Sequence, residues 1–325
     1  MVILVTGGGG FIGSHLIEYL LGETDESIVA FDNFSTGSRF NLDDVSSSRV
    51  EIKTADIRDA DAVEDAVRDA TSVYHLAAAV GVKRVVENPL AALKTNLRGT
   101  ENVLEAATMD ETPVFVASSS EVYGKSESLP FSETDDRVLG PTHIPRWGYA
   151  AAKATDEFLA LSYQQEHNLP VVIGRYFNIV GPRQTGEYGM VIPTFVDQAL
   201  ANEPITVYGD GTQSRSFTHV HDAVEMTYEL LQTPAADGEV FNIGAPDPIT
   251  INELANRIID LAGSDSSISY VPFEEVYGDD FEEPDRREPD VTKLRETIGT
   301  APTTDLDRIL EDVISERRDN EGLTA

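Results

Sequence analysis

The sequence predicts an α/β protein in which a doubly wound parallel sheet is followed by a smaller, mixed α/β C-terminal lobe. Two observations predict this fold: short apolar runs alternate with helical patterns in the first half of the chain, and the regular alternation ends after Phe177. Strands that alternate with helices form βαβ units, whose strands are parallel. The runs that we expect to be strands lie at 3–6, 28–31, 50–52, 73–76, 114–117 and 171–173.

Helical patterns fill the segments between these runs. The first follows the glycines at 7–10, and further helices are expected at 60–69, 88–107, 148–166, 192–201, 221–232, 251–262 and 304–317. Short strands are expected at 205–208 and 240–243. We therefore expect two domains. Residues 1–177 form the first, together with a returning segment near 215–245, and residues 178–214 and 246–325 form the second.

Composition excludes several classes of protein. The 325 residues are 41% hydrophobic and 25% charged, which is ordinary globular usage and excludes wholesale disorder. The absence of cysteine excludes disulfide scaffolds, thiolate metal sites and cysteine nucleophiles. No stretch resembles a signal peptide or approaches the roughly 18 apolar residues of a membrane span. We therefore expect a cytoplasmic protein.

The charge is unusual, because 57 Asp and Glu against 24 Lys and Arg give a net charge of −33. Such a surface repels phosphate backbones and anionic lipids, so we expect neither a nucleic-acid nor a membrane partner. Plentiful carboxylates also fit a salt-rich cytoplasm, where screening weakens their mutual repulsion. A halophilic source is therefore a hypothesis about habitat.

A dinucleotide site of the Rossmann type is indicated near the N-terminus. Gly7, Gly10 and Gly13 follow a strand and open a helix, so that a pyrophosphate can approach backbone amides at the helix N-terminus. Asp32 ends the second strand, where an acid hydrogen-bonds ribose hydroxyls and repels a 2′-phosphate. The predicted cofactor is NAD, and the first domain is its binding domain.

Tyr149 and Lys153 form a candidate catalytic pair, four residues apart on one face of a helix. We expect the neighbouring cation to lower the pKa of the phenol. Tyr149 can then take a proton from a sugar hydroxyl while a hydride leaves the same carbon. Ser118, Ser119, Ser120 and Glu121 end an earlier strand at the expected mouth of this site.

The chain resembles the extended short-chain dehydrogenases of the NAD-dependent epimerase/dehydratase family, which act on nucleotide sugars. The segments that carry the resemblance occur in the family's order and span nearly the whole chain: VTGGGGFIGSHL, DNFSTG, HLAAA, the Ser119/Tyr149/Lys153 triad, RYFNIVGPR and VYGDGTQSRSFTHVHD. The resemblance implies cofactor contacts from Gly7, Gly10, Phe11, Ile12, Gly13, Asp32, Asn33, Phe34, Ser35, Thr36, Gly37, Asp56, Ile57, Leu76, Ala77, Ala78, Tyr149, Lys153 and Tyr176. It implies nucleotide-diphosphate contacts from Asn178, Arg215 and Arg287, and a homodimer.

Within that family, SSEVYG after the fifth strand is similar to the motif of UDP-glucuronate decarboxylases and also to that of GDP-mannose 4,6-dehydratases. PRWGY at 145–149 is similar to a segment of the decarboxylase domain of the bacterial lipid A aminoarabinose pathway. The similarity to that decarboxylase domain implies catalytic roles for Glu121 and Arg287. Ser119, as a member of the family's triad, and the neighbouring Ser120 are further catalytic candidates. Glu121 can instead be a hydrogen-bond organiser, and Arg287 a plain diphosphate contact. The expected reaction is decarboxylation of UDP-glucuronate through transient oxidation at C4. The alternatives are 4-epimerisation of a UDP-hexose or UDP-hexuronate and, after it, 4,6-dehydration.

His219 and His221 invite interpretation as metal ligands. No third ligand at a suitable spacing accompanies them, and hydride transfer needs no metal, so we predict no metal site. Asp222 is expected instead to be the N-cap of the following helix.

Overall fold

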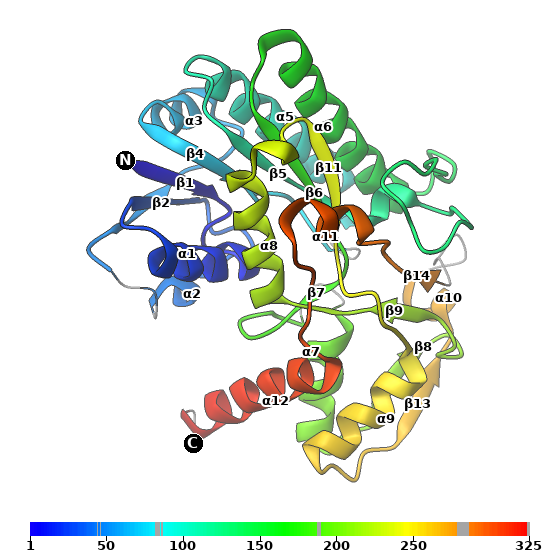
Figure 1. Ribbon diagram of the computed structural model, residues 1–325. Helices are drawn as coiled ribbons and strands as arrows, with labels where there is room; N and C mark the ends of the chain where they lie inside the picture. The colour runs from blue at the N-terminus through cyan, green and yellow to red at the C-terminus, as the bar shows by residue number, and fades with distance from the viewer. Residues whose placement is uncertain are drawn as a thin grey trace.

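The computed structural model describes residues 1–43, 45, 47–81, 85, 87–186, 190–277 and 286–323. Its centre is a seven-stranded sheet in the order β11-β6-β5-β4-β1-β2-β3, in which every neighbouring pair is parallel (Figure 1). The strands are β1 (Val2–Thr6), β2 (Ser27–Asp32), β3 (Val50–Thr54), β4 (Ala70–His75), β5 (Val114–Ser119), β6 (Val171–Tyr176) and β11 (Glu239–Ile243).

Helices cover both faces of this sheet (Figure 1). One face carries α1 (Phe11–Glu23), α2 (Phe40–Asp43), α8 (Val220–Gln232) and α11 (Thr292–Ile298). The other carries α3 (Ala60–Val67), α5 (Pro89–Thr108) and α6 (Arg146–His167). The predicted doubly wound α/β fold is confirmed.

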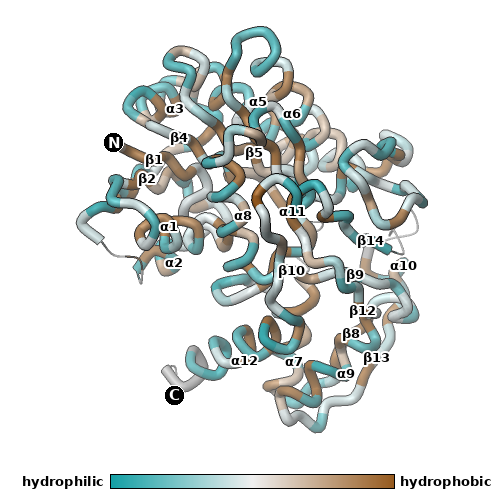
Figure 2. The backbone as a smooth tube through the Cα atoms, viewed as in Figure 1, coloured by the Kyte–Doolittle hydropathy of each residue, from teal (hydrophilic) through white to brown (hydrophobic). Residues whose placement is uncertain are grey.

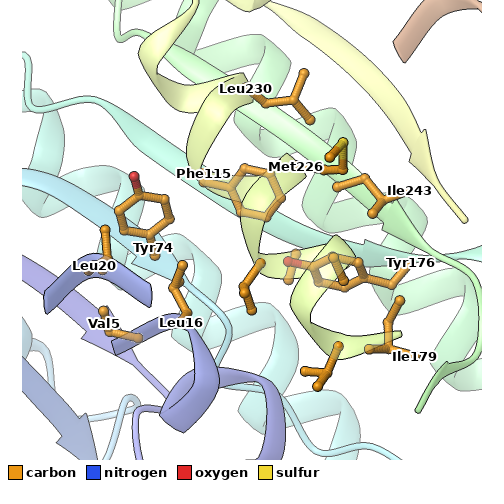
Figure 3. Close-up of a cluster of buried hydrophobic side chains, with 14 of the residues drawn as sticks. Val5, Leu16, Leu20, Tyr74, Phe115, Tyr176, Ile179, Met226, Leu230 and Ile243 are labelled. Carbon is orange, nitrogen blue, oxygen red and sulfur yellow. The ribbon is translucent and has the colours of Figure 1, made fainter. Parts of the chain in front are cut away.

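The inner strands are largely buried because both faces of the sheet are covered, whereas the edge strand β3 is partly exposed. Successive side chains of a strand point to opposite faces, so Ile3 and Val5 belong to the cluster under α1 and α8, whereas Leu4 belongs to the cluster under α3 and α5. In the first cluster the Phe115 ring lies between Tyr74 and Tyr176, with ring centroids 6.4 and 6.2 Å away (Figure 3). A near-continuous apolar strand is therefore expected for a sheet that sits between two helical layers.

The second lobe has its own hydrophobic core, formed mainly by α7 (Val191–Leu200), α9 (Ile251–Ala262) and α12 (Leu306–Leu323). The tube of α12 is mostly teal and white, whereas β1 is brown (Figure 2), in keeping with a helix that covers the lobe and a strand inside the molecule. Thr250 and Glu253 form a reciprocal capping box at the start of α9, and Gly263 ends the helix in the left-handed region at φ 61°.

Three small sheets lie outside the central sheet. The pairs are β7 (Ile179–Val180) with β10 (Thr218–His219) and β8 (Ile205–Tyr208) with β13 (Ile268–Val271), and β9 (Ser214–Ser216) lies between β12 (Pro248–Thr250) and β14 (Arg286–Arg287). The remaining elements are α10 (Phe273–Tyr277) and the 3₁₀ turns η1 (Ser120–Tyr123) and η2 (Pro234–Ala236).

The expected capping role of Asp222 is wrong. Helix α8 begins at Val220, and its N-cap is His219, whose Nδ1 accepts a hydrogen bond from the His221 amide at 3.1 Å. Asp222 therefore lies in the first turn, where its Oδ2 accepts hydrogen bonds from the Thr303 and Thr304 amides at 3.1 and 2.9 Å. The carboxylate fastens the segment that leads into α12.

Candidate active site

A cavity of about 580 Å³ runs along the carboxyl ends of the central strands and into the second lobe. It lies where β1 and β4 are neighbours and the chain leaves the sheet to opposite sides, which is where open α/β sheets bind their ligands. The cavity collects residues from both halves of the predicted site. They are Gly7, Gly10, Phe11, Ile12, Gly13, Asp32, Asn33, Ser35, Thr36, Ile57, Leu76, Ala77, Ala78, Ser119, Ser120, Glu121, Tyr149, Lys153, Tyr176, Asn178, Arg215 and Arg287. Phe34, Gly37 and Asp56 do not line it.

The glycine loop leaves room where side chains would fill it. A Cβ at Gly13 would lie 2.1 Å from the Gly7 carbonyl oxygen, and Gly7 itself has φ 74°, so both positions require glycine. Gly10 is the N-cap of α1 and lines the cavity. The unpaired amides of the first helical turn therefore face a space suited to the pyrophosphate of NAD.

Asp32 orders this loop. Its Oδ2 accepts a hydrogen bond from the Gly9 amide at 3.0 Å, and its Oδ1 accepts one from the Phe34 amide at 2.7 Å. Burial raises the pKa of Asp32, and these backbone donors oppose that effect. A carboxylate has about four lone-pair sites, so Asp32 retains sites that can accept ribose hydroxyls at the cavity wall.

The three predicted cofactor residues outside the cavity support its wall. Phe34 has φ 55°, and its ring lies 4.5 Å from the Arg39 guanidinium. A Cβ at Gly37 would meet the Gly9 backbone at 2.7 Å. Asp56 accepts hydrogen bonds from Asn33 and Arg58, and the Arg58 hydrogen bond lowers the pKa of Asp56 well below its usual range. These contacts hold the loop after β2 against the glycine loop.

Tyr149 and Lys153 lie one turn apart on α6, as predicted. The Lys153 ammonium is buried and donates to the Ala117 carbonyl at 2.9 Å and to Asp156 Oδ2 at 3.2 Å. Burial raises the pKa of Tyr149, the Glu121 charge raises it further, and a hydrogen bond with Ser119 lowers it. The expectation of a lowered pKa for this phenol is wrong for the protein alone: burial is the largest effect and raises it, and the charges of Glu121 and, to a smaller extent, Asp156 raise it further.

Glu121 lies between two arginines. Its Oε1 accepts a hydrogen bond from Arg287 Nη1 at 2.6 Å, and Arg146 Nη2 lies 3.4 and 3.3 Å from its two oxygens. Burial disfavours the charged form of Glu121, but the charges of Arg287 and Arg146 outweigh burial and lower its pKa to about 2. In this arrangement Glu121 is a carboxylate that accepts hydrogen bonds.

Register places the two late arginines side by side. Strands β14 and β9 are parallel, and Arg287 pairs with Arg215. Arg215 Nη1 donates to the Ser214 carbonyl at 2.7 Å, and the side-chain Nδ2 of Asn178 donates to the Ser216 carbonyl at 2.8 Å. Two buried guanidinium groups on neighbouring strands suit a ligand with phosphate or carboxylate oxygens.

Ser119, Ser120 and Tyr176, which were also predicted as site residues, line the cavity but belong to neither the glycine loop nor the arginine pair. Ser119 Oγ accepts a hydrogen bond from the Glu121 amide at 3.3 Å, and Ser120 is buried. The Tyr176 hydroxyl is 2.6 Å from Thr227 Oγ1 on α8, so only the ring of Tyr176 faces the cavity.

Sequence reasoning missed two residues as functional candidates, Arg146 and Asp156. Arg146 is three residues before Tyr149 and therefore lies on the same face of α6, where it contacts Glu121. Asp156 is three residues after Lys153 and contacts its ammonium. Helical spacing around the Tyr149/Lys153 pair was the available signal for both.

Within the described residues, no cluster of three or more His, Asp or Glu side chains is arranged to hold a metal ion. The His219 and His221 rings meet edge to face with centroids 4.7 Å apart. The described helices also include none that combines the length and apolarity needed to cross a membrane.

Comparison with known proteins identifies the family of this chain. The sequence matches the NAD-dependent epimerase/dehydratase family over residues 3–244. It is 43% identical, over 98% of both chains, to a UDP-N-acetyl-alpha-D-glucosaminuronate decarboxylase of Bacillus cytotoxicus. It is 35% identical to UDP-glucuronic acid decarboxylase 1 of Arabidopsis thaliana, over 97% of this chain and 69% of that protein.

Solved structures give the same fold. A UDP-glucuronic acid 4-epimerase of Bacillus cereus, in complex with UDP-glucuronic acid and NAD, superposes with a TM-score of 0.88 at 29% identity, over 98% of this chain and 100% of that one. A UDP-glucose 4-epimerase of Thermotoga maritima gives 0.89 at 28% identity, over 99% and 100%. The resemblance, the enzyme class and the cofactor predicted from the sequence are thus confirmed, and the chain belongs to the NAD-dependent epimerase/dehydratase family.

Proposed function

We propose that this chain decarboxylates a UDP-linked hexuronate after transient oxidation of the sugar at C4. The observation that carries the proposal is the cluster of Glu121, Arg146 and Arg287 in the cavity that also contains Tyr149. Decarboxylation requires recognition of a carboxylate on the sugar, and guanidinium groups supply that recognition. The relatives of highest identity given above are also named as decarboxylases.

The first chemical task is removal of a proton from the C4 hydroxyl. Tyr149 is the group that accepts this proton, with Ser119 as the hydrogen-bonding partner of the phenol. Lys153, fixed by Ala117 and Asp156, would hold the ribose of bound NAD and supply positive charge to the site. NAD, when bound, would accept the hydride from C4 and would return it to C4 after carbon dioxide has left and C5 has been protonated, so that the product is a UDP-pentose.

The second task is loss of the carboxylate. A ketone at C4 is β to the C6 carboxylate, so carbon dioxide can leave with the electron pair delocalised onto the C4 oxygen. The carboxylate that leaves is the group through which the substrate binds Arg146 or Arg287. In the protein without substrate, Glu121 binds these two arginines. When a substrate carboxylate shares these arginines, the pKa of Glu121 rises, which suits Glu121 to hold a proton for C5.

The 4-epimerase alternative is supported by the solved structures, since both neighbours described above are named as 4-epimerases. An epimerase that acts on a hexuronate also needs groups that bind a carboxylate. It differs in that the C4 ketone turns over in the pocket and all carbons are retained.

Incubation with NAD and a panel of UDP-glucuronate, UDP-N-acetylglucosaminuronate, UDP-glucose and a GDP-hexose tests the proposal, with NMR of the products and measurement of released carbon dioxide. We expect a UDP-pentose, or its 2-acetamido form, together with carbon dioxide from at least one hexuronate. A C4 epimer without carbon dioxide would establish the epimerase alternative, and a 4-keto-6-deoxy sugar would establish dehydration. Tyr149→Phe is the control for activity that does not come from this site.

Three broader proposals accompany this one. The NAD-binding domain comprises residues 1–177 with the segment near 215–245, and residues 178–214 and 246–325 form the substrate lobe.

The protein is a homodimer, a proposal supported by the exposed Leu90 and Phe158 on the packed helices α5 and α6. Size-exclusion chromatography with light scattering measures the oligomeric state. The protein is also cytoplasmic, which fractionation of the source cells tests.

A further inference from the structure

The ion pair beneath the catalytic tyrosine contains a carboxylate that the reaction does not require. Asp156 follows Lys153 by one turn of α6, and its Oδ2 lies 3.2 Å from the Lys153 Nζ. Both side chains are inaccessible to solvent, with Asp156 0% and Lys153 3% exposed. Water therefore screens this pair very little, and each charge acts strongly on its neighbours.

The carboxylate of Asp156 makes fewer hydrogen bonds than a buried carboxylate with a purely structural role would need. Its Oδ1 accepts no hydrogen bond from any residue in the described part of the chain. The Thr100 hydroxyl on α5 faces the carboxylate and favours its ionised form, but its geometry falls short of a hydrogen bond to Oδ1. Burial raises the pKa of Asp156, and Lys153 opposes this effect. Burying a carboxylate that has one oxygen without a hydrogen bond costs stability. The contact with Lys153 is the main interaction that offsets this cost.

The contact has two effects on the site. First, the Ala117 carbonyl and Asp156 Oδ2 take two of the three ammonium protons of Lys153, which fixes the direction of the third. Second, a positive and a negative charge 3.2 Å apart act on Tyr149 as a dipole rather than as a full cation. The negative charges of Glu121 and Asp156 both raise the pKa of Tyr149.

The other titratable groups that face this pair do not replace Asp156. His75 of β4 is buried, and burial together with the Lys153 charge lowers its pKa to about 3, so it stays neutral near pH 7. Glu157, the next residue on α6, forms an ion pair with Arg175 at 2.8 Å. Asp156 is therefore the carboxylate that directly contacts the Lys153 ammonium in the described structure.

We propose that Asp156 is a positioning residue for Lys153, which anchors the ammonium under the active site and offsets the charge that Lys153 presents to Tyr149. The role depends only on the Tyr149/Lys153 site. It holds for decarboxylation and for epimerisation alike.

Asp156→Asn is the most direct test, because asparagine keeps the size and an accepting oxygen but removes the charge. The acidic limb of the pH profile of kcat/KM should move to lower pH by about one unit, since Tyr149 then faces a less compensated cation. The substrate is the UDP-sugar that the product panel identifies. A variant profile that superimposes on that of the parent would overturn the proposal.

A second measurement requires no substrate. The chain has six lysines, so NMR of the lysine ε-carbons in the cofactor-free protein can follow Lys153, assigned by loss of its signal in Lys153→Arg. The chemical shift of the Lys153 signal should differ between Asp156→Asn and the parent, because the ammonium has lost the anion that lies 3.2 Å from it. An unchanged chemical shift would overturn the proposal even if the protein proves to act on another sugar.

Asp222→Asn is the matched control, because Asp222 is also a buried aspartate but lies on α8 and binds the Thr303 and Thr304 amides. It should lower the melting temperature without moving the pH profile or the Lys153 signal. If Asp156→Asn does not fold, Asp156→Ala provides the same two readouts, with an additional fall in kcat because the ammonium loses its anchor. An Asp222→Asn shift equal to that of Asp156→Asn would show a general effect of stability and would contradict the assigned role.

Discussion

The two ends of the cavity are built by different means. At the nucleotide end, close backbone packing shapes the site: Gly13 touches Gly7, and Asp32 accepts hydrogen bonds from two amides. At the sugar end, the site consists of charged side chains from separate parts of the chain, among them Glu121 and Arg287, which are 166 residues apart in sequence.

This difference assigns separate functions to the two ends. A backbone cradle recognises the shape and charge of a cofactor and changes little with pH, because amides do not titrate. A cluster of one carboxylate and two guanidinium groups can exchange partners, so its charge state can follow the substrate through a reaction. We therefore expect the nucleotide end to supply binding and the sugar end to determine which reaction occurs.

Tyr149→Phe should have the largest effect of the changes proposed here, on the reaction at the sugar end of the cavity. The change removes the proton acceptor and almost no volume, so turnover should fall on the order of 10² to 10⁴-fold. NAD binding, measured by calorimetry, should be unchanged. Near-parent turnover in a variant that binds NAD would show that Tyr149 is not the base.

Glu121→Gln should change how the free energy of unfolding depends on pH, because it removes the negative charge between Arg146 and Arg287. The pKa of Glu121 is lowered from 4.5 to about 2, so its ionic contribution is fully present above pH 4.5 and is lost as pH falls towards 2. The variant should be less stable than the parent at pH 6, and the difference should shrink below pH 4.5. Parallel denaturation curves across this range would contradict the assigned ion pairs.

Asp32→Ala should weaken the nucleotide end more moderately. The parent should bind NAD far better than NADP, because Asp32 accepts ribose hydroxyls and repels a 2′-phosphate. The variant should lose NAD affinity and narrow that preference, as measured by calorimetric titration with both cofactors. Equal affinities of the parent for NAD and NADP would refute this assignment.

Added KCl should have the smallest effect on the site and a general effect on the fold. The net charge of −33 destabilises the compact state, and salt screens repulsion among exposed carboxylates. The melting temperature should therefore rise from low to molar KCl, while the cluster of half-buried Glu121 with the buried Arg146 and Arg287 responds little. A melting temperature independent of salt would argue against the halophilic hypothesis.

The nucleotide end could be predicted closely because its signals are local. Glycine spacing and the acid at the end of β2 follow from the geometry of one βαβ unit, which Gly7, Gly13 and Asp32 display directly. The alternation of apolar runs likewise predicted the central sheet. The position of Asp222 was wrong because α8 begins two residues before it, at Val220, and helix boundaries depend on tertiary contacts that propensity does not contain.

The sugar end was predicted only in part, since its properties arise from contacts distant in sequence. Glu121 and Arg287 were expected to act, but their direct contact could not be derived from spacing. The pKa of Tyr149 was expected to be lowered by Lys153, yet burial and two nearby carboxylates raise it. The sign of such an effect depends on how the charges balance in three dimensions.

The pairing of Arg215 with Arg287 on adjacent strands has a kinetic consequence. Nucleotide sugars are anions, and a chain with a net charge of −33 repels them at a distance, whereas the buried guanidinium groups attract them at close range. Salt screens the distant repulsion beyond about 8 Å at physiological ionic strength and acts much less on buried contacts. Substrate capture should therefore accelerate as ionic strength rises, the reverse of the behaviour of an enzyme whose overall field steers its ligand inward.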